Sequence, residues 1–371
     1  MEDKSFSVVD NSNVYYHGHY WNDYELVRKH INKRISSSPV MKWYQHFIKT
    51  HEGKKFKKAL FVNCGNGWVE REIYQAGLFE EAIGVDYLQP LIDEAQKEAT
   101  ALDLPIRYYQ LDINAGTFPE TGFDLVVNHA GCHHIAYLNK VLKAINEVMT
   151  DDGYFINFDY VGAHRNQYPY EQWSEIYSLN ESLPAELRQE LTFPHLPTML
   201  ATDPTEAIHS ELIIEYTNRY FEMEEHKRAG GALAYPILTF NKQMQQAIPE
   251  LQERWIRHIL IRDVTYTEKF PASSMFDYFI GKPNKSVLKD DALMKQFADE
   301  ENARETKASA NGGYYYPLTF FQHLTLEMED LKLKNFHMRS DLHRIYDNPV
   351  TAFTGSFKHN IKDFVAKLKQ Q

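Results

Sequence analysis

The chain is poor in cysteine, in long apolar runs and in excess positive charge, and each scarcity excludes a class of protein. Among 371 residues there are 2 cysteines, Cys64 and Cys132, too few for a disulfide framework. No apolar run approaches the roughly 18 residues of a membrane span, and the N-terminus lacks a signal-peptide core. The net charge of -11 argues against a nucleic-acid partner. We therefore expect a cytoplasmic protein without a membrane span.

The composition is that of a folded globular protein. Apolar residues make up 43% of the chain, whose length suffices for one large domain or for a core with a second lobe. Strand and helix patterns alternate up to about residue 160, which predicts a parallel sheet with ligands at the carboxyl ends of its strands. Strands are predicted at 60–62, 82–85, 108–112, 122–129, 154–160, 221–226 and 274–280, and a long helix at 243–262.

A glycine-containing turn, Cys64-Gly-Asn-Gly67, follows the first strand and precedes a helical pattern. Its glycines let the backbone approach a ligand closely, and the N–H groups of the helix that begins there face the same space. Asp86 ends the second strand, where an acid accepts hydrogen bonds from both ribose hydroxyls. A dinucleotide site needs a small residue where this chain has Glu70. S-adenosylmethionine, which has no phosphates, therefore fits better than a dinucleotide.

Residues 57–165 resemble the class I S-adenosylmethionine-dependent methyltransferases, motif by motif. The resemblance implies a Rossmann-like sheet of seven strands, the last antiparallel. It also implies that the glycine turn holds the methionine part of the cofactor, the acid after the second strand the ribose, and the acid after the third strand the adenine. The residues so assigned to the cofactor are Asn63, Cys64, Gly65, Asn66, Gly67, Asp86, Tyr87, Leu88, Asp112, Ile113, Asn128 and His129.

Two positions of the first motif depart from the family pattern. Phe61 stands where the family has an acid, and Asn63 stands where it has its first glycine. The departure puts one contact to the cofactor amino group in doubt. Glu70 and the N-terminal segment are the alternatives for supplying it.

A bacterial subgroup of these enzymes, associated with surface-glycan or natural-product pathways, resembles the chain from about Trp21 to Pro283. The resemblance rests on Trp21-Asn-Asp-Tyr, on Arg34-Ile-Ser, on Asp159-Tyr-Val-Gly with Arg165 close behind, and on the segments 199–207 and 230–231. It implies a small-molecule or saccharide acceptor.

Methyl transfer to a hydroxyl requires removal of a proton, and a histidine titrates in the useful range. His133 and His134 follow the fourth strand directly, and we favour this pair as the base, with Asp159 orienting a histidine or the acceptor. The alternative is that one histidine packs against the following helix. His164 is a further candidate. An available base favours oxygen as the methylated atom.

The substrate contacts come from two segments. Tyr20, Trp21 and Arg34 form either a lid over the cofactor or a packed N-terminal arm. His164 and Arg165 follow the fifth strand, and Arg165 suits either an anionic acceptor or a structural role. We expect no metal site, because His17 and His19 have no third ligand at a recognisable spacing.

We divide the chain into an aromatic arm and helical lid (1–56), a methyltransferase core (57–284) with a helical insertion at 166–215, and a C-terminal extension (285–371). For the extension, a substrate lobe and a homodimer element both stay open. Tyr314 to Tyr316 suit either stacking on a flat acceptor or core packing. N-methylation of a small metabolite, methylation of a protein or nucleic acid, and a non-catalytic cofactor-binding scaffold remain the alternative functions.

Overall fold

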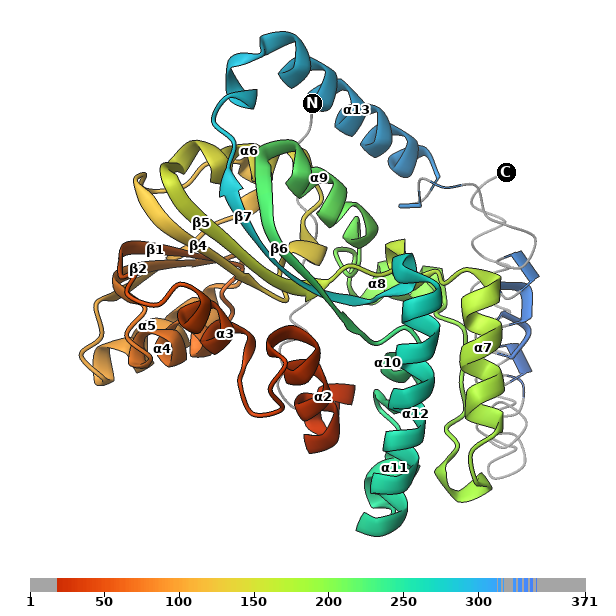
Figure 1. Ribbon diagram of the computed structural model, residues 1–371. Coiled ribbons are helices and arrows are strands. Elements are labelled where there is room, and N and C mark those ends of the chain that lie inside the picture. Colours follow the sequence, from red (N-terminus) through yellow and green to blue (C-terminus); the bar gives the residue numbers. More distant parts are fainter. Residues whose placement is uncertain are drawn as a thin grey trace, which may run out of the picture. The chain divides into compact units, whose positions relative to one another are not determined.

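The computed structural model describes residues 19–311, Gly313, Tyr314, Tyr316 and scattered positions between 323 and 338. Within this part of the chain, seven strands form one sheet with the order β3-β2-β1-β4-β5-β7-β6 (Figure 1). Strand β7 is antiparallel to β5 and β6, and the other neighbouring pairs are parallel. The predicted fold class is confirmed. The strands are β1 (Phe56–Val62), β2 (Phe79–Asp86), β3 (Ile106–Gln110), β4 (Phe123–His129), β5 (Met149–Tyr160), β6 (Phe221–Gly230) and β7 (Phe276–Pro283).

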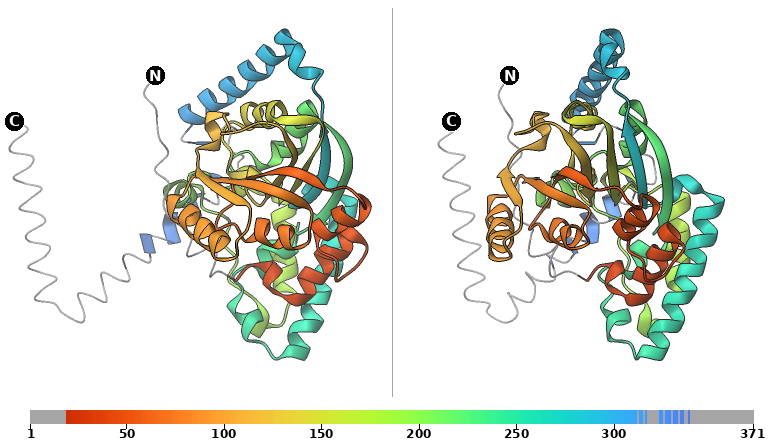
Figure 2. Two further views of the ribbon diagram at one scale, coloured as in Figure 1. Left: turned by 90° about the vertical axis from the view of Figure 1, so that its left-hand side faces the viewer. Right: turned by 60° about the vertical axis from the view of Figure 1, so that its left-hand side comes forward.

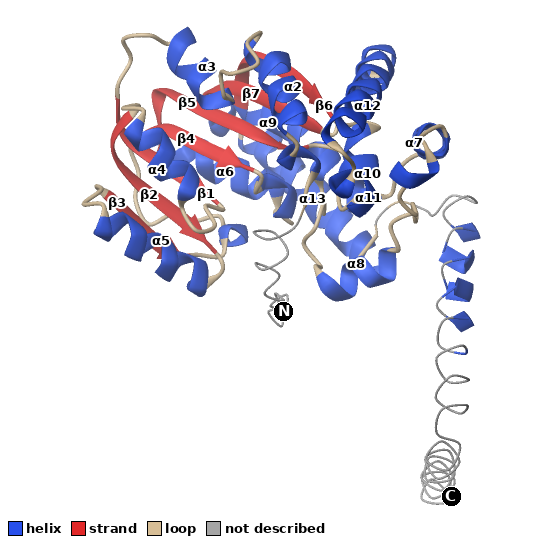
Figure 3. Cartoon of the chain, turned by 90° about the horizontal axis from the view of Figure 1, so that it is seen from below, coloured by secondary structure: helices blue, strands red, loops and turns tan. Residues whose placement is uncertain are grey.

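Helices cover both faces of the parallel part of the sheet, which is why its central strands are continuous apolar runs. In Figure 1, α3, α4 and α5 lie below the sheet, and α6, α9 and α13 lie above it. Figure 3 shows α4 and α5 over the end formed by β1, β2 and β3. The bounds of these helices are α3 (Trp43–Thr50), α4 (Trp68–Gln75), α5 (Gln89–Ala101), α6 (Leu138–Val148), α9 (Ile213–Tyr220) and α13 (Asp291–Ala310).

The remaining helices gather at one end of the sheet. In both views of Figure 2, the red helix α2 lies beside the teal helix α12, and the two are in contact. Helix α10 contacts both α7 and α12. The bounds are α2 (Glu25–Ser36), α7 (Tyr170–Glu181), α8 (Leu196–Thr202), α10 (Ala234–Leu238), α11 (Lys242–Gln246) and α12 (Pro249–Lys269).

Two elements differ from the sequence prediction. The single helix expected at 243–262 is two helices, α11 and α12, because Pro249 lacks an N–H and begins a new helix in the first turn of α12. Strand β3 ends at Gln110, before the expected Asp112. Asp112 instead caps the 3-10 turn η2 (Ile113–Ala115) by accepting the N–H of Asn114 at 2.9 Å.

The described helix of the C-terminal extension belongs with the core. Helix α13 contacts α6, and residues up to Tyr316 form one compact unit, with a second unit from Pro317 onward. Three predictions lie wholly or partly outside the described residues: the aromatic arm before residue 19 with His17, the middle tyrosine of the 314–316 run, and the chain end. Among the described helices, none is long and apolar enough to cross a membrane.

Candidate active site

The glycine turn after β1 is tied to the end of β2 by one carboxylate. Asp86 accepts the backbone N–H of Gly65 on Oδ2 and that of Leu88 on Oδ1, both at 2.9 Å. Gly65 and Gly67 have φ values of 58° and 73°, in the left-handed region that favours glycine. Burial raises the pKa of Asp86, while these backbone donors oppose the rise. The predicted ribose-binding acid and the predicted turn thus form one structural unit.

Asn63 keeps the backbone shape expected of the glycine that it replaces. Its φ is 51°, a left-handed conformation that asparagine tolerates better than most residues. Its side-chain Nδ2 donates to the carbonyl oxygen of Gly131 at 2.7 Å. A Cβ on Gly131 would lie 2.5 Å from the Asn63 Cβ, so this close approach requires glycine. Asn63 therefore links the glycine turn to the loop after β4.

Phe61 and Glu70, the other unusual residues of the motif, face the protein interior. Phe61 packs against Phe79 with ring centroids 5.5 Å apart. Glu70 is fully buried, near Cys64 and Tyr108, and burial raises its pKa to about 8. It forms no ion pair within the described part of the chain. A side chain buried in this way does not reach a ligand above the strand ends.

The other predicted cofactor residues are spread over three neighbouring loops. Tyr87 is 40% exposed and Asp112 is exposed, while Ile113 is buried. Asn128 is fully buried, and its Nδ2 donates to Asn157 and Asp159 at 2.6 Å each. His129 stacks on Trp43 with centroids 5.6 Å apart and meets the edge of Trp68; burial lowers its pKa to about 4. These contacts hold Asn128 against β5 and His129 against α3 and α4, and the assignment of both residues to the cofactor stays a prediction.

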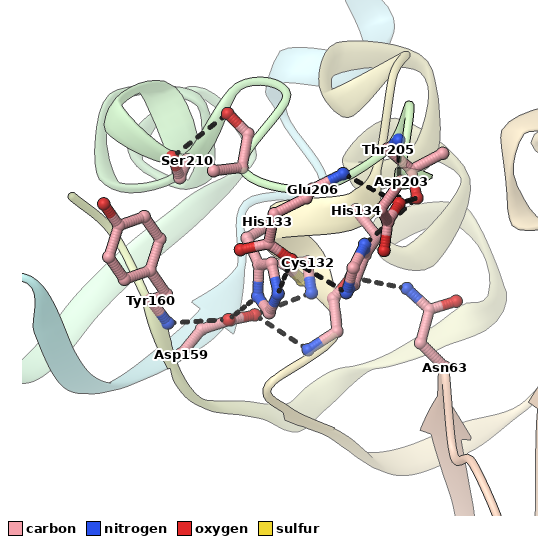
Figure 4. Close-up of polar contacts among 12 residues, drawn as sticks. Asn63, Cys132, His133, His134, Asp159, Tyr160, Asp203, Thr205, Glu206 and Ser210 are labelled. Carbon is pink, nitrogen blue, oxygen red and sulfur yellow. Dashed lines mark hydrogen bonds and ion pairs between the residues drawn. The ribbon is translucent and has the colours of Figure 1, made fainter. Parts of the chain in front are cut away.

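A histidine–acid cluster follows β4, formed by His133, His134, Asp159, Asp203 and Glu206 (Figure 4). The two histidines end the 3-10 turn η3 (Cys132–His134). His133 Nδ1 lies 2.5 Å from Asp159 Oδ1, and His134 Nδ1 lies 3.1 Å from Thr205 Oγ1. The Nε2 atoms of both histidines lie 3.8 Å from Glu206 Oε2.

Asp159 is the anchor of this cluster. Its Oδ2 accepts the N–H groups of Gly131 at 3.1 Å and Cys132 at 2.6 Å, besides the amide of Asn128. Its Oδ1 accepts from His133 and from the Tyr160 backbone. With these donors around a side chain that is 1% exposed, Asp159 is positioned to orient His133.

The two histidines differ in their electrostatic surroundings. Burial lowers the pKa of His133, but the charge and hydrogen bond of Asp159, together with Glu206 and Asp203, outweigh burial and raise it to about 9. Burial also lowers the pKa of His134, and the neighbouring His133 lowers it further. Burial raises the pKa of Asp159, yet the charge of His133 and the hydrogen bonds from His133, Asn128 and the Cys132 backbone together outweigh this effect and lower it overall. The pair is therefore asymmetric.

Glu206 was not among the predicted site residues. It lies on the loop after α8, which the backbone fastens to the histidine turn: Ile208 N donates to the His133 carbonyl at 3.0 Å. Arg165 holds the loop from the other side, donating its guanidinium to the carbonyls of Pro204 at 2.5 Å and Glu206 at 3.1 Å. The acidic run Asp203-Pro-Thr-Glu206, set off by a proline after a helix, is the pattern that marks the loop in the sequence.

Tyrosines surround the outer side of Glu206. Burial, followed by the charge of Glu206, raises the pKa of Tyr20 to about 12. Burial, the neighbouring tyrosines and Glu206 raise the pKa of Tyr160 and Tyr235 above the usual range. The Tyr160 ring packs against Tyr235 with centroids 6.0 Å apart. Two predicted substrate residues thus lie near the cluster: the charge of Glu206 acts on Tyr20, and Arg165 donates to the Glu206 carbonyl.

The other predicted substrate residues make structural contacts. Trp21 is 2% exposed and stacks on Phe276 with centroids 5.1 Å apart. Arg34 donates to the Arg228 carbonyl at 3.2 Å and to Glu268 at 3.4 Å. His164 Nδ1 donates to the Ile208 carbonyl at 2.5 Å, and burial lowers its pKa to about 2, which leaves it neutral. Arg165 is buried with a φ of 54°.

Comparisons with known proteins identify the central part of the chain. Residues 60–157 match the model of a methyltransferase domain. The rat protein "Arginine-hydroxylase NDUFAF5, mitochondrial" is 28% identical over 145 residues, 36% of this chain and 40% of that protein. The demethylmenaquinone methyltransferase of Thermus thermophilus is 23% identical over 130 residues, 35% of this chain and 59% of that protein. The chain thus spans about half the length of these curated relatives.

One solved structure found by comparison is geranyl diphosphate C-methyltransferase from Streptomyces coelicolor A3(2). It is 11% identical, covers 64% of this chain and 78% of its own, and has a TM-score of 0.40. The domain match and the curated methyltransferase relative support a class I S-adenosylmethionine-dependent methyltransferase domain, with S-adenosylmethionine as its cofactor. The relatives' names include a hydroxylase as well as methyltransferases.

Proposed function

We propose that the protein transfers the methyl group of S-adenosylmethionine to a hydroxyl of a small-molecule or saccharide acceptor, with the histidine pair assisting removal of the proton. The observation that carries this proposal is the link from Asn63 to Gly131, which joins the cofactor turn to the loop that bears His133 and His134. Because parallel strands end at one edge, a methyl donor above the turn lies next to the histidine–acid cluster.

The chemistry makes few demands on the protein. The acceptor oxygen attacks the methyl carbon, the C–S bond breaks, and S-adenosylhomocysteine leaves as a neutral thioether. Alignment of the two reactants supplies much of the rate acceleration of methyl transfer. The histidine–acid cluster assists by accepting the proton of the acceptor hydroxyl. The asymmetric pair suits this task, since Asp159 fixes the ring of His133 and Thr205 fixes that of His134.

The tyrosines near Glu206 support the acceptor class. Tyr20, Tyr160 and Tyr235 offer flat rings with a polar end, which suit a sugar or a small aromatic molecule. The net charge of -11 makes a nucleic-acid acceptor unfavourable. We place the protein in the cytoplasm and in glycan or natural-product biosynthesis on the sequence resemblance and the low cysteine content.

The first experiment is titration calorimetry of the full chain with S-adenosylmethionine and, separately, with NAD. We expect micromolar binding of S-adenosylmethionine alone. Incubation with methyl-labelled cofactor and a panel of sugars and phenols then identifies the acceptor by label transfer. If neither S-adenosylmethionine nor NAD binds, the result would contradict a methyltransferase activity and favour a non-catalytic scaffold. If S-adenosylmethionine binds but the methyl group is transferred only to amines, the methylated atom is nitrogen and not oxygen.

A further inference from the structure

The two histidines of the cluster direct the same ring nitrogen toward one carboxylate. His133 and His134 are adjacent in the chain, and their ring centroids lie 4.1 Å apart. Each Nε2 lies 3.8 Å from the same oxygen of Glu206, Oε2. Figure 4 shows both rings beside the Glu206 carboxylate. Three ligand-type atoms from two separate segments thus surround one point, all within 4.8 Å of one another.

Hydrogen bonds at the opposite ring nitrogens select the tautomer of each neutral ring. Asp159 Oδ1 accepts from His133 Nδ1. Thr205 Oγ1 donates to Asp203 Oδ1 at 2.8 Å, so it accepts from His134 Nδ1. In each neutral ring the proton is therefore on Nδ1 and the lone pair is on Nε2. A partner at Nδ1 that orients the ring is the usual arrangement behind a metal-binding histidine.

The spacing suits an ion between these atoms. Zinc lies about 2.0 to 2.2 Å from imidazole nitrogen and carboxylate oxygen, so two of its ligands are at most about 4.4 Å apart. The two separations between a histidine Nε2 and Glu206 Oε2 are 3.8 Å and fall within this limit, and the ligand atoms of the two histidines lie within 4.8 Å of each other. The surroundings also suit a cation, because three carboxylates, Asp159, Asp203 and Glu206, accompany two imidazoles.

We propose that His133, His134 and Glu206 bind one divalent transition-metal cation at the acceptor end of the active site. Two imidazoles and one carboxylate are a donor set for first-row divalent metals and leave coordination positions open for an oxygen ligand. This proposal replaces the expectation of no metal, which considered His17 and His19. Glu206 follows His134 by 72 residues (206 minus 134), so no local spacing indicates the site.

The ion explains how the histidine pair assists the reaction, and this part rests on the proposed function. An acceptor hydroxyl bound to the cation ionises more easily, as metal-bound water does. Its proton passes to solvent, the oxygen attacks the methyl carbon, and the C–S bond breaks to release S-adenosylhomocysteine. The histidines then act as ligands, and Asp159 and Thr205 act as positioning residues that keep each Nε2 turned toward the ion.

The test is titration calorimetry of the chelator-treated full chain with Zn²⁺. We expect one ion per chain, and in Glu206→Gln an affinity lower by at least about tenfold, since loss even of groups behind the ligands costs about 10- to 100-fold. Circular dichroism and S-adenosylmethionine binding check that the variant is folded. His134→Gln is the second variant, with the same expected loss.

A matched control comes from another histidine-rich group. His51, Glu224, Glu225 and His226 line a hollow of about 600 Å³ that shares no residue with the cluster. Glu225→Gln should leave Zn²⁺ binding unchanged. If Glu225→Gln weakens binding and Glu206→Gln does not, the ion binds elsewhere and the proposal is overturned. Absence of stoichiometric binding to the folded wild-type chain overturns it equally.

Failure of this proposal and failure of the proposed function give different results. Methyl transfer that persists in chelator, with no Zn²⁺ bound, leaves a methyltransferase with a direct histidine base. Zn²⁺ binding that depends on Glu206, without S-adenosylmethionine binding, leaves the metal site and removes the methyltransferase. We expect both ligands to bind, and we expect chelator to lower turnover at least tenfold while cofactor affinity stays within twofold.

Discussion

Arg165 fixes the backbone of Glu206: its guanidinium donates to the Glu206 carbonyl at 3.1 Å, and its own N–H donates to the Ala207 carbonyl at 2.7 Å. Arg165 has a φ of 54°, an unfavourable conformation for a residue with a side chain. The two residues are 41 positions apart in the chain, and their contact places the Glu206 carboxylate beside the histidines.

Replacing Arg165 by alanine should therefore release the Glu206 loop. We expect the free energy of unfolding to fall by about 1.5 to 3 kcal/mol, the scale of a hydrogen bond to a charged group. Turnover should fall by up to about 100-fold through misplacement of the cluster, with S-adenosylmethionine affinity unchanged. Arg257→Ala, on the exposed surface of α12, is the control. Wild-type turnover in Arg165→Ala would show that the loop holds its position without the guanidinium.

The Asp86 carboxylate provides a test of the cofactor site. Asp86→Ala should weaken S-adenosylmethionine binding by about 1 to 3 kcal/mol, or about 5- to 150-fold, because a charged hydrogen bond and the anchor of Gly65 are both lost. Titration calorimetry measures the change. Asp93→Ala, on α5, should bind the cofactor like the wild type. Equal affinities for the two variants would remove the ribose assignment.

The histidine pair should separate binding from turnover. His133→Ala and His134→Ala should each bind S-adenosylmethionine with wild-type affinity while methyl transfer slows by on the order of 10² to 10⁴. Initial rates with the identified acceptor give the comparison, and His258→Ala on α12 serves as the control. Full activity in both single variants would show that neither histidine takes part in removing the proton.

The close contact between Asn63 and Gly131 predicts opposite effects at two neighbouring positions. Gly131→Ala puts a methyl group 2.5 Å from the Asn63 Cβ and 3.0 Å from Asn128 Oδ1, which should destabilise the fold by about 1 to 3 kcal/mol. Ala130 has a φ of 54°, so Ala130→Gly should stabilise it by up to about 1 kcal/mol. Denaturant titration measures both. If Gly131→Ala and Ala130→Gly change the free energy of unfolding alike, the close contact at Gly131 and the left-handed backbone at Ala130 are contradicted.

Glu70 predicts a pH dependence of stability. Burial raises the pKa of Glu70 from 4.5 to about 8, so the folded state holds its proton more tightly than the unfolded state. Stability from this residue is fully present below pH 4.5 and is lost as pH rises through about 8, by on the order of a few kcal/mol. Glu70→Gln, which stays neutral, should flatten the dependence. Parallel stability curves for both proteins would mean that Glu70 ionises in both states alike.

Much of the fold was predictable because its pattern is local. The apolar run of β1, the glycine turn and Asp86 lie within 31 residues (56 to 86), and β1 and β2 pair in parallel, so this short stretch contains the turn and the acid that meet at the strand ends. Strand β3 was overestimated because Asp112 forms a capped turn, which competes with strand extension. The break in the long helix depends on Pro249, which begins α12 directly after Ile248. A proline at this place in the sequence indicates that one helix ends and another begins.

The candidate site was predictable only in part, because its geometry depends on a distant loop. His133, His134 and Asp159 could be proposed from their places after strands. The loop that carries Glu206 is held beside them by Arg165, which bonds the loop carbonyls, and by the Ile208 N–H, which bonds the His133 carbonyl, and no periodicity in the sequence encodes these contacts. The sequence alone suggests that Arg165 binds an anionic substrate, and its burial became known only from the structure.

Helix α13 limits how far the C-terminus of a recombinant fragment can be truncated. The carboxylate of Glu301 accepts the N–H groups of Asn139 at 2.6 Å and Lys140 at 3.2 Å, in the first turn of α6. That turn follows the histidine segment. A fragment ending with the last strand, at Pro283, would leave those amides without this acceptor and uncover the outer side of α6. A minimal recombinant domain should therefore extend through Ala310, although the seven strands of the described residues are complete 27 residues earlier (310 minus 283).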